Sequence, residues 1–324
     1  MRLLKALVLI LAITGTVALL LASRATARPL TAISAINPAM NYAYVRIAGR
    51  VVEYPSISTD NGALSFQVQD AGGIIRVTAY RAVLEKLLAR KTIPMPGSQA
   101  TVEGTLRVRE GDPSLTLNDA AALQLETAPA RLIPLAALDA MQPGDRASVI
   151  GQVRRVRDAG NLRIVSLRSG SATGDLLIPL GLSAVIGQPP LPAVGDWISV
   201  TGSVAEYRGK REMLVTNGQD VAASPAQELD LRPFSALTRS LLGQWVAIRG
   251  DVSKLRPLKQ GMLIDLTDGA GGSTTVAMFD IWYSVPFSRT LKAGDSLMAQ
   301  GVLVDYNGRL EMQPELSVDL IQNQ

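Results

Sequence analysis

The sequence predicts an all-β protein of three tandem five-stranded Greek-key barrels, each with a short helix between its third and fourth strands and all preceded by an N-terminal hydrophobic helix. Three observations predict this fold class: a unit of about a hundred residues that occurs three times, alternating apolar residues around recurring glycines, and a helical segment at one place in each unit. The expected domains are residues 29–127, 128–226 and 227–324, after a leader over 1–28.

The repeat is marked by glycines at a spacing of seven residues. The stretch GSQATVEGTLRVREG holds Gly97, Gly104 and Gly111, and the same spacing recurs in GDWISVTGSVAEYRG and GDSLMAQGVLVDYNG. The central glycines of the second and third stretches are Gly202 and Gly301. A glycine inside a strand is tolerated where the strand bends or where another backbone approaches closely, as in a small barrel. We therefore expect sheets that close on themselves.

Each unit supplies the strands and the helix of one barrel. In the first unit a strand passes through Gly49, a hairpin covers 63–80, and a helix is expected over 82–91. The third glycine of each seven-residue series lies between two strand-like segments and is expected in a hairpin turn with positive φ. The expected counterparts of the first helix are 180–188 and 280–291.

These segments resemble the nucleic-acid-binding OB-fold family, of the type found in the anticodon-binding domain of class II aminoacyl-tRNA synthetases and in DNA-repair proteins. The resemblance is carried by VRIAGRVV and FQVQDAGGIIRVTAY in the first unit and by IDLTDGAGGSTTVAMF and GDSLMAQGVLVDYNGRLEM in the third, and it covers nearly all of 43–321. The middle unit departs from it at 168–170, where Arg-Ser-Gly replaces an Asp-Gly turn. The resemblance implies a groove across the second and third strands that binds single strands.

The composition argues against an enzyme. The chain has no histidine and no cysteine, which removes the imidazole base, the thiolate nucleophile, disulfides and the usual transition-metal ligands. Neither a nucleophile-elbow motif, a phosphate-binding loop nor a dinucleotide fingerprint is present. We expect a non-enzymatic protein without a cofactor or a metal.

The leader predicts export. Arg2 and Lys5 precede an uncharged apolar run over 6–22, and Arg24 follows it. This pattern is typical of either a retained transmembrane helix or a signal peptide cut near 25–27. The expected location is therefore the cell membrane of a bacterial-type envelope, with a single-pass anchor and extracytoplasmic domains, or secretion after signal cleavage.

The most basic segment is the hairpin GQVRRVRDAGNLRIVSLR in the middle unit. Guanidinium groups on one hairpin can bind successive phosphates or an acidic partner, whereas charges on exposed strands also simply protect edges. The candidate nucleic-acid-binding residues there are Arg154, Arg155, Arg157, Arg163 and Arg168.

Aromatic residues near the expected groove supply the other candidates. Phe66 and Tyr80 lie on or beside the second and third strands of the first unit, together with Arg76, and would stack on bases or else fill the barrel. Tyr207 and Tyr306 occupy one repeat position, two residues before the hairpin glycine, where a cross-strand pair is the alternative.

The expected function is binding of single-stranded nucleic acid. Lys and Arg number 32 against 28 acidic residues, but Arg2, Lys5 and Arg24 flank the apolar run of the leader, so the remainder of the chain is nearly neutral. This balance does not favour a general polyanion surface and leaves two alternatives open. One is a structural or protein-interaction scaffold with an envelope protein as partner, and the other is oligosaccharide binding at the aromatic segment 279–287.

Overall fold

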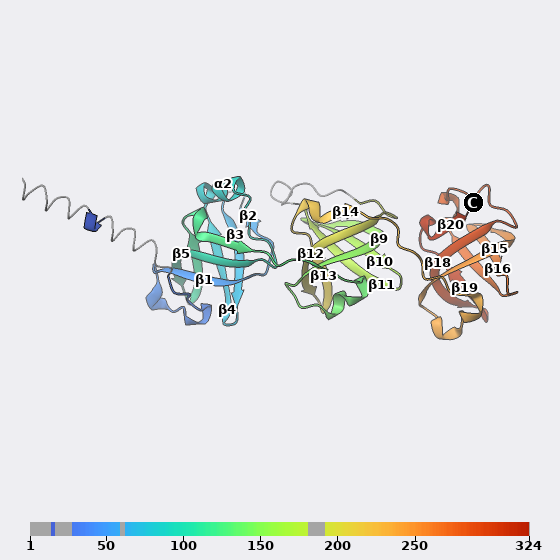
Figure 1. Ribbon diagram of the computed structural model, residues 1–324, viewed down its shortest axis with the longest axis horizontal. Helices are drawn as coiled ribbons and strands as arrows, with labels where there is room; N and C mark the ends of the chain where they lie inside the picture. The colour runs from blue at the N-terminus through green and yellow to red at the C-terminus, as the bar shows by residue number, and fades with distance from the viewer. Residues whose placement is uncertain (1–13, 17–27, 59–61, 181–191, 324) are drawn as a thin grey trace, which may run out of the picture. The chain divides into compact units, whose positions relative to one another are not determined.

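The computed structural model describes residues 14–16, 28–58, 62–180 and 192–323. The described chain is mostly β-structure, arranged in three sheets with few helices (Figure 1), so the predicted all-β class is confirmed. Two compact units contain these sheets. Met1–Ala128 holds the first sheet, and Pro129–Gln324 holds the second and third.

The first sheet returns on itself. Its ladder runs β1-β3-β4-β6-β5, and β5 also pairs with β1, which closes the ring of strands. All long pairings are antiparallel except the parallel pair β4–β6. As predicted, an α-helix, α2 (Arg81–Ala89), connects the third and fourth long strands. The strands are β1 (Tyr44–Val51), β2 (Ser56–Ile57), β3 (Leu64–Asp70), β4 (Gly73–Ala79), β5 (Gln99–Arg109), β6 (Asp112–Leu117) and β7 (Leu123–Glu126).

The second sheet repeats this pairing scheme. Its ladder runs β9-β10-β11-β13-β12 and is closed by the pair β9–β12. The helix expected over 180–188 lies outside the described residues apart from Leu180. The strands are β8 (Arg131–Leu132), β9 (Arg146–Ala159), β10 (Leu162–Ser169), β11 (Ala172–Pro179), β12 (Trp197–Tyr207), β13 (Lys210–Leu214) and β14 (Val221–Ala223).

The third sheet closes through the pair β15–β18. The α-helix expected over 280–291 is not formed, and the 3-10 turn η9 (Trp282–Ser284) takes its place. Pro286 disfavours a helical conformation in the residue before it, and Val285 is extended, so the helix ends after one turn. The strands are β15 (Trp245–Leu258), β16 (Gly261–Thr267), β17 (Ser273–Phe279), β18 (Ser296–Tyr306), β19 (Arg309–Gln313) and β20 (Leu320–Asn323).

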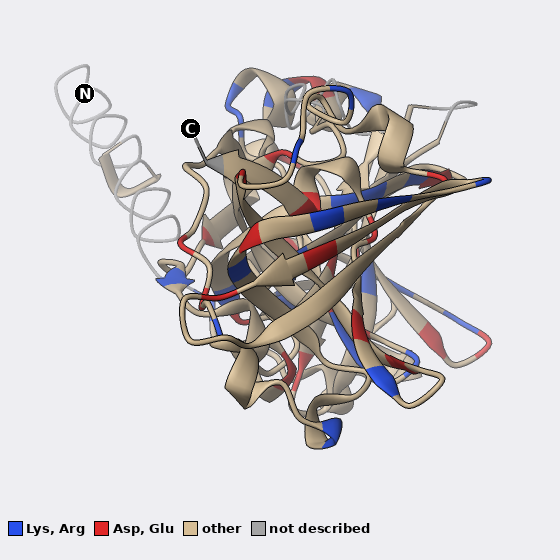
Figure 2. Cartoon of the chain, turned by 90° about the vertical axis from the view of Figure 1, so that its right-hand side faces the viewer, with Lys and Arg blue, Asp and Glu red and all other residues tan. Residues whose placement is uncertain are grey.

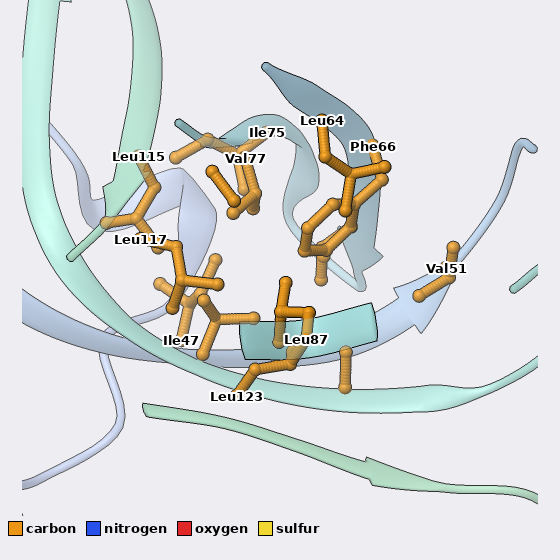
Figure 3. Close-up of a cluster of buried hydrophobic side chains, with 14 of the residues drawn as sticks. Ile47, Val51, Leu64, Phe66, Ile75, Val77, Leu87, Leu115, Leu117 and Leu123 are labelled. Atoms are coloured by element: carbon orange, nitrogen blue, oxygen red, sulfur yellow. The ribbon is translucent and has the colours of Figure 1, made fainter. Parts of the chain in front are cut away.

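Each sheet encloses its own apolar core. In the first, alternate residues of the strands point inward, and Leu87 of α2 joins them (Figure 3). The ring of Phe66 points into this cluster beside Leu64 and is only 2% exposed. Burying one such side chain contributes roughly 1.5–3 kcal/mol, which favours the register that keeps these residues inside.

The central glycines of the sequence repeat lie where two strands approach too closely for a side chain. A Cβ at Gly104, Gly202 or Gly301 would overlap a carbonyl oxygen of the neighbouring fifth strand. Here the fourth strand pairs with the first strand, and from the next residue on it also pairs with the fifth. The carbonyl groups concerned belong to Thr116, Leu214 and Gln313.

The third glycine of each series lies in a tight hairpin turn, as predicted. In all three turns both central residues have positive φ, for example 52° at Arg208 and 77° at Gly209. Such mirror-image turns match the twist of the flanking strands, and glycine adopts the second position without strain.

The predicted membrane location is overturned. Within the part of the chain that the structure describes, no helix combines the length and apolar character needed to cross a bilayer. The leader over 1–28, on which the single-pass anchor was predicted, lies outside the described residues except for 14–16 and 28. Its apolar run is near the shortest length that spans a membrane, which made the sequence signal weak.

We predict that Gly301→Ala destabilises the protein by roughly 1–3 kcal/mol, because the new methyl group would push β18 away from β19. Gly269→Ala, in the loop between β16 and β17, is the control, since an added Cβ there meets no atom within 4 Å. Urea unfolding followed by tryptophan fluorescence measures both changes. Equal midpoints for the two variants would contradict the close-approach explanation.

Candidate nucleic-acid interface

The outer face of each closed sheet carries a row of polar side chains across its second, third and fifth strands. Side chains alternate along a strand, so these residues point away from the core while their neighbours point into it. Figure 2 shows Lys and Arg interspersed with Asp and Glu along the strands. From the first sheet to the third, the rows of register partners are Gln67, Arg76 and Ser114; Ser166, Asp175 and Glu212; and Asp265, Thr275 and Glu311.

The third sheet has a pocket of about 700 Å³ on this face. Lys254 and Arg256 come from the end of β15, and Arg309 from the start of β19. Arg256 donates from Nε and Nη2 to the two carboxylate oxygens of Asp265, at 3.0 and 2.7 Å. The Thr275 hydroxyl donates to the same carboxylate at 2.8 Å. The apolar part of the wall is formed by Phe234, Leu237 and Leu310.

The cations of the third-sheet pocket are of two kinds, one paired with a carboxylate and the others unpaired within the described chain. Burial raises the pKa of Asp265, but the hydrogen bonds from Arg256 and Thr275 outweigh it and leave this pKa below its ordinary value. Arg256 is therefore neutralised within the protein. Lys254 and Arg309 are exposed and have no ion-pair partner among the described residues, which leaves them available to a ligand.

The second sheet repeats the cations and the glutamate 99 residues earlier in the chain, while its aspartate, Asp175, lies on the neighbouring strand. Asp175 accepts hydrogen bonds from the Ser166 hydroxyl at 2.7 Å and from Lys210 Nζ at 2.9 Å. Burial again raises the pKa of this carboxyl, and the two donors lower it below its usual range. The matching positions are Arg155 and Lys254, Arg157 and Arg256, Ser166 and Asp265, Lys210 and Arg309, and Glu212 and Glu311.

Tyr207 and Tyr306 lie at the edge of these two faces. Each ends the fourth strand of its sheet, and they are 58% and 60% exposed. Across the hairpin Tyr207 pairs with Lys210, and Tyr306 with Arg309. The structure thus brings the two predicted tyrosines next to cations of the outer face.

The first sheet has a smaller groove with a different charge pattern. A pocket of about 300 Å³ is lined by Tyr54, Gln67 and Arg76, among others, and Arg76 occupies the position that Asp175 has in the second sheet. Tyr80 is 48% exposed and precedes α2. Phe66, also predicted for this surface, lies in the core with no face free for stacking.

Two arginines of the predicted basic hairpin are used inside the second compact unit. Arg154 donates from Nη1 and Nη2 to the two carboxylate oxygens of Asp319, both at 2.6 Å. Its guanidinium and that of Arg168 lie over the ring of Trp245, at 4.9 and 4.0 Å from the centroid. The Arg154 side chain is only 7% exposed, and burial lowers the pKa of Arg168. These two residues join the second sheet to the third.

A β-bulge in β9 explains why the side chains of Arg154 and Arg155 have different surroundings. Ser166 of β10 pairs with Arg155, and the next residue, Leu167, pairs with Val153, so Arg154 is the extra residue of the bulge. Arg163 forms an ion pair with Asp158 at 2.7 Å. Of the five arginines predicted from the hairpin, Arg155 and Arg157 are the exposed pair on the outer face.

Sequence reasoning missed the cations of the third sheet. Lys254, Arg256 and Arg309 are scattered in the sequence, and no local run marks them. The signal that identifies them is the repeat itself, because each lies 99 residues after a basic residue of the middle unit. The aromatic segment proposed for oligosaccharides is divided, with Trp282 3% exposed in the core and Phe279 and Tyr283 exposed.

Comparison with known proteins gives structural neighbours only. No family model matches the chain, and no curated protein matches it. Among solved structures, it is similar to a replication protein A heterotrimer bound to single-stranded DNA, with 11% identity and a TM-score of 0.32, covering 91% of this chain and 96% of that chain. It is also similar to OBody AM1L10 bound to hen egg-white lysozyme, with 19% identity, a TM-score of 0.26, and coverage of 31% and 98%. Asparaginyl-tRNA synthetase from Pyrococcus horikoshii has 19% identity and a TM-score of 0.25, with coverage of 32% and 23%. Because these TM-scores are low, we base the assignment below on the strand pairings and the side chains.

We predict that Asp319→Asn costs roughly 3–5 kcal/mol of unfolding free energy, because it removes the buried carboxylate of Arg154 and leaves only the exposed Glu315 carboxylate at 3.3 Å. Asp158→Asn, which removes the carboxylate of a more exposed arginine pair, serves as the control and should cause a much smaller loss. Thermal unfolding of both variants tests this. A loss in Asp319→Asn no larger than in the control would show that the buried pair does not hold the two sheets together.

We predict that Glu311→Gln raises the melting temperature at pH 7. Burial raises the pKa of Glu311, so its charged form is less favourable in the folded than in the unfolded protein. This cost is absent below the unfolded pKa of about 4.3, where both states are protonated, and develops as the pH rises through the folded pKa. Melting curves from pH 4 to 7 should therefore show a stabilisation in the variant that disappears near pH 4. A pH-independent difference would contradict the assignment.

Proposed function

We propose that each closed sheet is an OB-fold barrel, giving three in tandem, and that the protein binds single-stranded nucleic acid without catalysing a reaction. The observation that carries this proposal is the repeated set of cations on the outer faces of the second and third barrels. Arg155, Arg157 and Lys210 of one barrel match Lys254, Arg256 and Arg309 of the other, position by position. The strand order of each sheet supports the barrel assignment.

Cations would bind the phosphates of the nucleic acid, and an exposed tyrosine would stack on a base. Lys254 and Arg309, which have no internal partner among the described residues, would bind phosphates at the third barrel. Tyr306, exposed beside Arg309, presents an aromatic face to a base. Stacking of a base on such a ring contributes about 1–3 kcal/mol and tolerates any base.

The internal ion pairs hold the outer face in shape. The Arg256–Asp265–Thr275 cluster fixes the floor of the third-barrel pocket through three hydrogen bonds. The Lys210–Asp175–Ser166 cluster has the same role in the second barrel. Because these pairs consume charge, each face retains few free cations, and we expect modest affinity with a clear dependence on salt.

We predict that the double variant Lys254→Ala with Arg309→Ala weakens binding of a labelled single-stranded oligonucleotide by roughly tenfold or more at low salt, since it removes two charge-assisted phosphate contacts. The slope of log Kd against log salt should fall by about 1.4, at about 0.7 per phosphate contact. Fluorescence anisotropy of the full chain measures both quantities.

The control variant carries Arg289→Ala and Lys292→Ala, which remove the same charge from exposed positions of the same unit away from the pocket. Its affinity and salt slope should stay close to those of the unchanged protein. An equal loss in both double variants would indicate attraction by net charge alone. Failure of the unchanged protein to bind at micromolar concentration and low salt would overturn the proposed function.

A further inference from the structure

Glu311 is a largely buried glutamate on the outer face of the third sheet. The residue is 7% exposed and has no hydrogen bond or ion pair within the described chain. It pairs in register with Thr275, which lines the third-barrel pocket, so both side chains lie on the same outer face. Its charge interacts with those of Arg256, Asp265 and Arg309, which line that pocket. Glu311 is therefore a neighbour of residues that line the pocket, and its carboxylate has no donor among the described residues.

The second barrel has a half-buried glutamate at the same repeat position. Glu212 lies 99 residues before Glu311, pairs in register with Asp175, and likewise has no hydrogen-bond or ion-pair partner among the described residues. Burial and a neighbouring aspartate raise the pKa of both glutamates. The first barrel has Ser114 at this position. The arrangement is thus built twice, in the two barrels that share the cation pattern.

A buried carboxylate that lacks donors destabilises the folded protein, and a ligand with N–H groups would relieve that cost. A phosphate has no such group at neutral pH and would be repelled. A nucleobase has N–H groups on its Watson–Crick edge, which is open in a single strand. The cations at the edge of the pocket can bind the backbone while the carboxylate faces a base.

Building on the proposed function, we propose that Glu212 and Glu311 are specificity-determining residues that accept hydrogen bonds from base edges and select guanine over thymine or uracil. Guanine presents two adjacent donors, N1–H and the N2 amino group, that match the two oxygens of a carboxylate. Thymine and uracil present one N–H between two carbonyl oxygens, which the carboxylate repels. Bidentate recognition of this kind discriminates against the wrong base by roughly tenfold or more.

The test compares two labelled single-stranded DNA probes on the full chain, one of thymine only and one with alternating thymine and guanine. The unchanged protein should bind the guanine probe at least tenfold more tightly. In a variant with Glu212→Gln and Glu311→Gln this preference should fall to about twofold, because an amide lacks the second acceptor. Glu228→Gln, which removes an exposed carboxylate of the same unit, should keep the full preference.

A third probe, in which inosine replaces guanine, removes only the N2 amino donor. We expect the unchanged protein to bind the inosine probe less tightly than the guanine probe. We expect the double glutamine variant to bind these two probes equally well. Thermal unfolding confirms that each variant is folded.

Three outcomes would overturn this inference. If the affinity of the glutamine variant rises by the same factor for the thymine and the guanine probe, the glutamates only repel the backbone, and the proposed function stands without base recognition. If the unchanged protein binds both probes equally, it again binds nucleic acid but does not select guanine. If it binds neither probe at micromolar concentration, the proposed function fails as well.

Discussion

The closure of each sheet depends on how closely its fourth strand approaches two neighbours. At the central glycine the fourth strand pairs with the first strand and also lies against a carbonyl of the fifth, where no side chain fits. Overpacking at such a point costs of the order of 1–3 kcal/mol, so the glycines at 104, 202 and 301 are required by geometry. Closure in turn separates an apolar inside from a polar outside, and the outer face exists because the ring of strands is complete.

The outer faces then differ by their charges although their backbones agree. The same strand pairings place Arg76 in the first sheet where the second has Asp175. In the second and third sheets an aspartate is held by a hydroxyl and a cation, while a glutamate on the fifth strand keeps no donor. A carboxylate that is shielded from water and has no donor is costly. Its occurrence at one repeat position, on the buried Glu311 and the half-buried Glu212, favours a role in binding over a defect of packing.

The sequence predicted the fold better than the site, for physical reasons. Alternation and glycine spacing report local backbone requirements, so the strands, the hairpin turns and the helix α2 could be predicted. The bulge at Arg154 could not, because one extra residue in a strand leaves no mark in composition, yet it turns that side chain into a buried pair with Asp319. Lys254 and Arg309 were missed because they come together only through strand pairing, although the 99-residue period identifies them once the sheets are aligned.

The buried pair between Arg154 and Asp319 also affects the overall affinity that two outer faces, each of modest affinity, can reach together. Each face of the second and third sheets keeps few free cations, which alone gives modest affinity for a polyanion. When two sites belong to one compact unit, binding at the first raises the effective concentration of the same strand at the second, and overall affinity can exceed that of either site by about a hundredfold or more. The ion pair, with both carboxylate oxygens at 2.6 Å, limits the motion of the second sheet relative to the third. Less motion in the free protein reduces the conformational entropy lost when one nucleic-acid strand binds both sheets. Under the proposed function, the arginine withdrawn from the outer face would therefore still contribute to binding, through the arrangement that it stabilises.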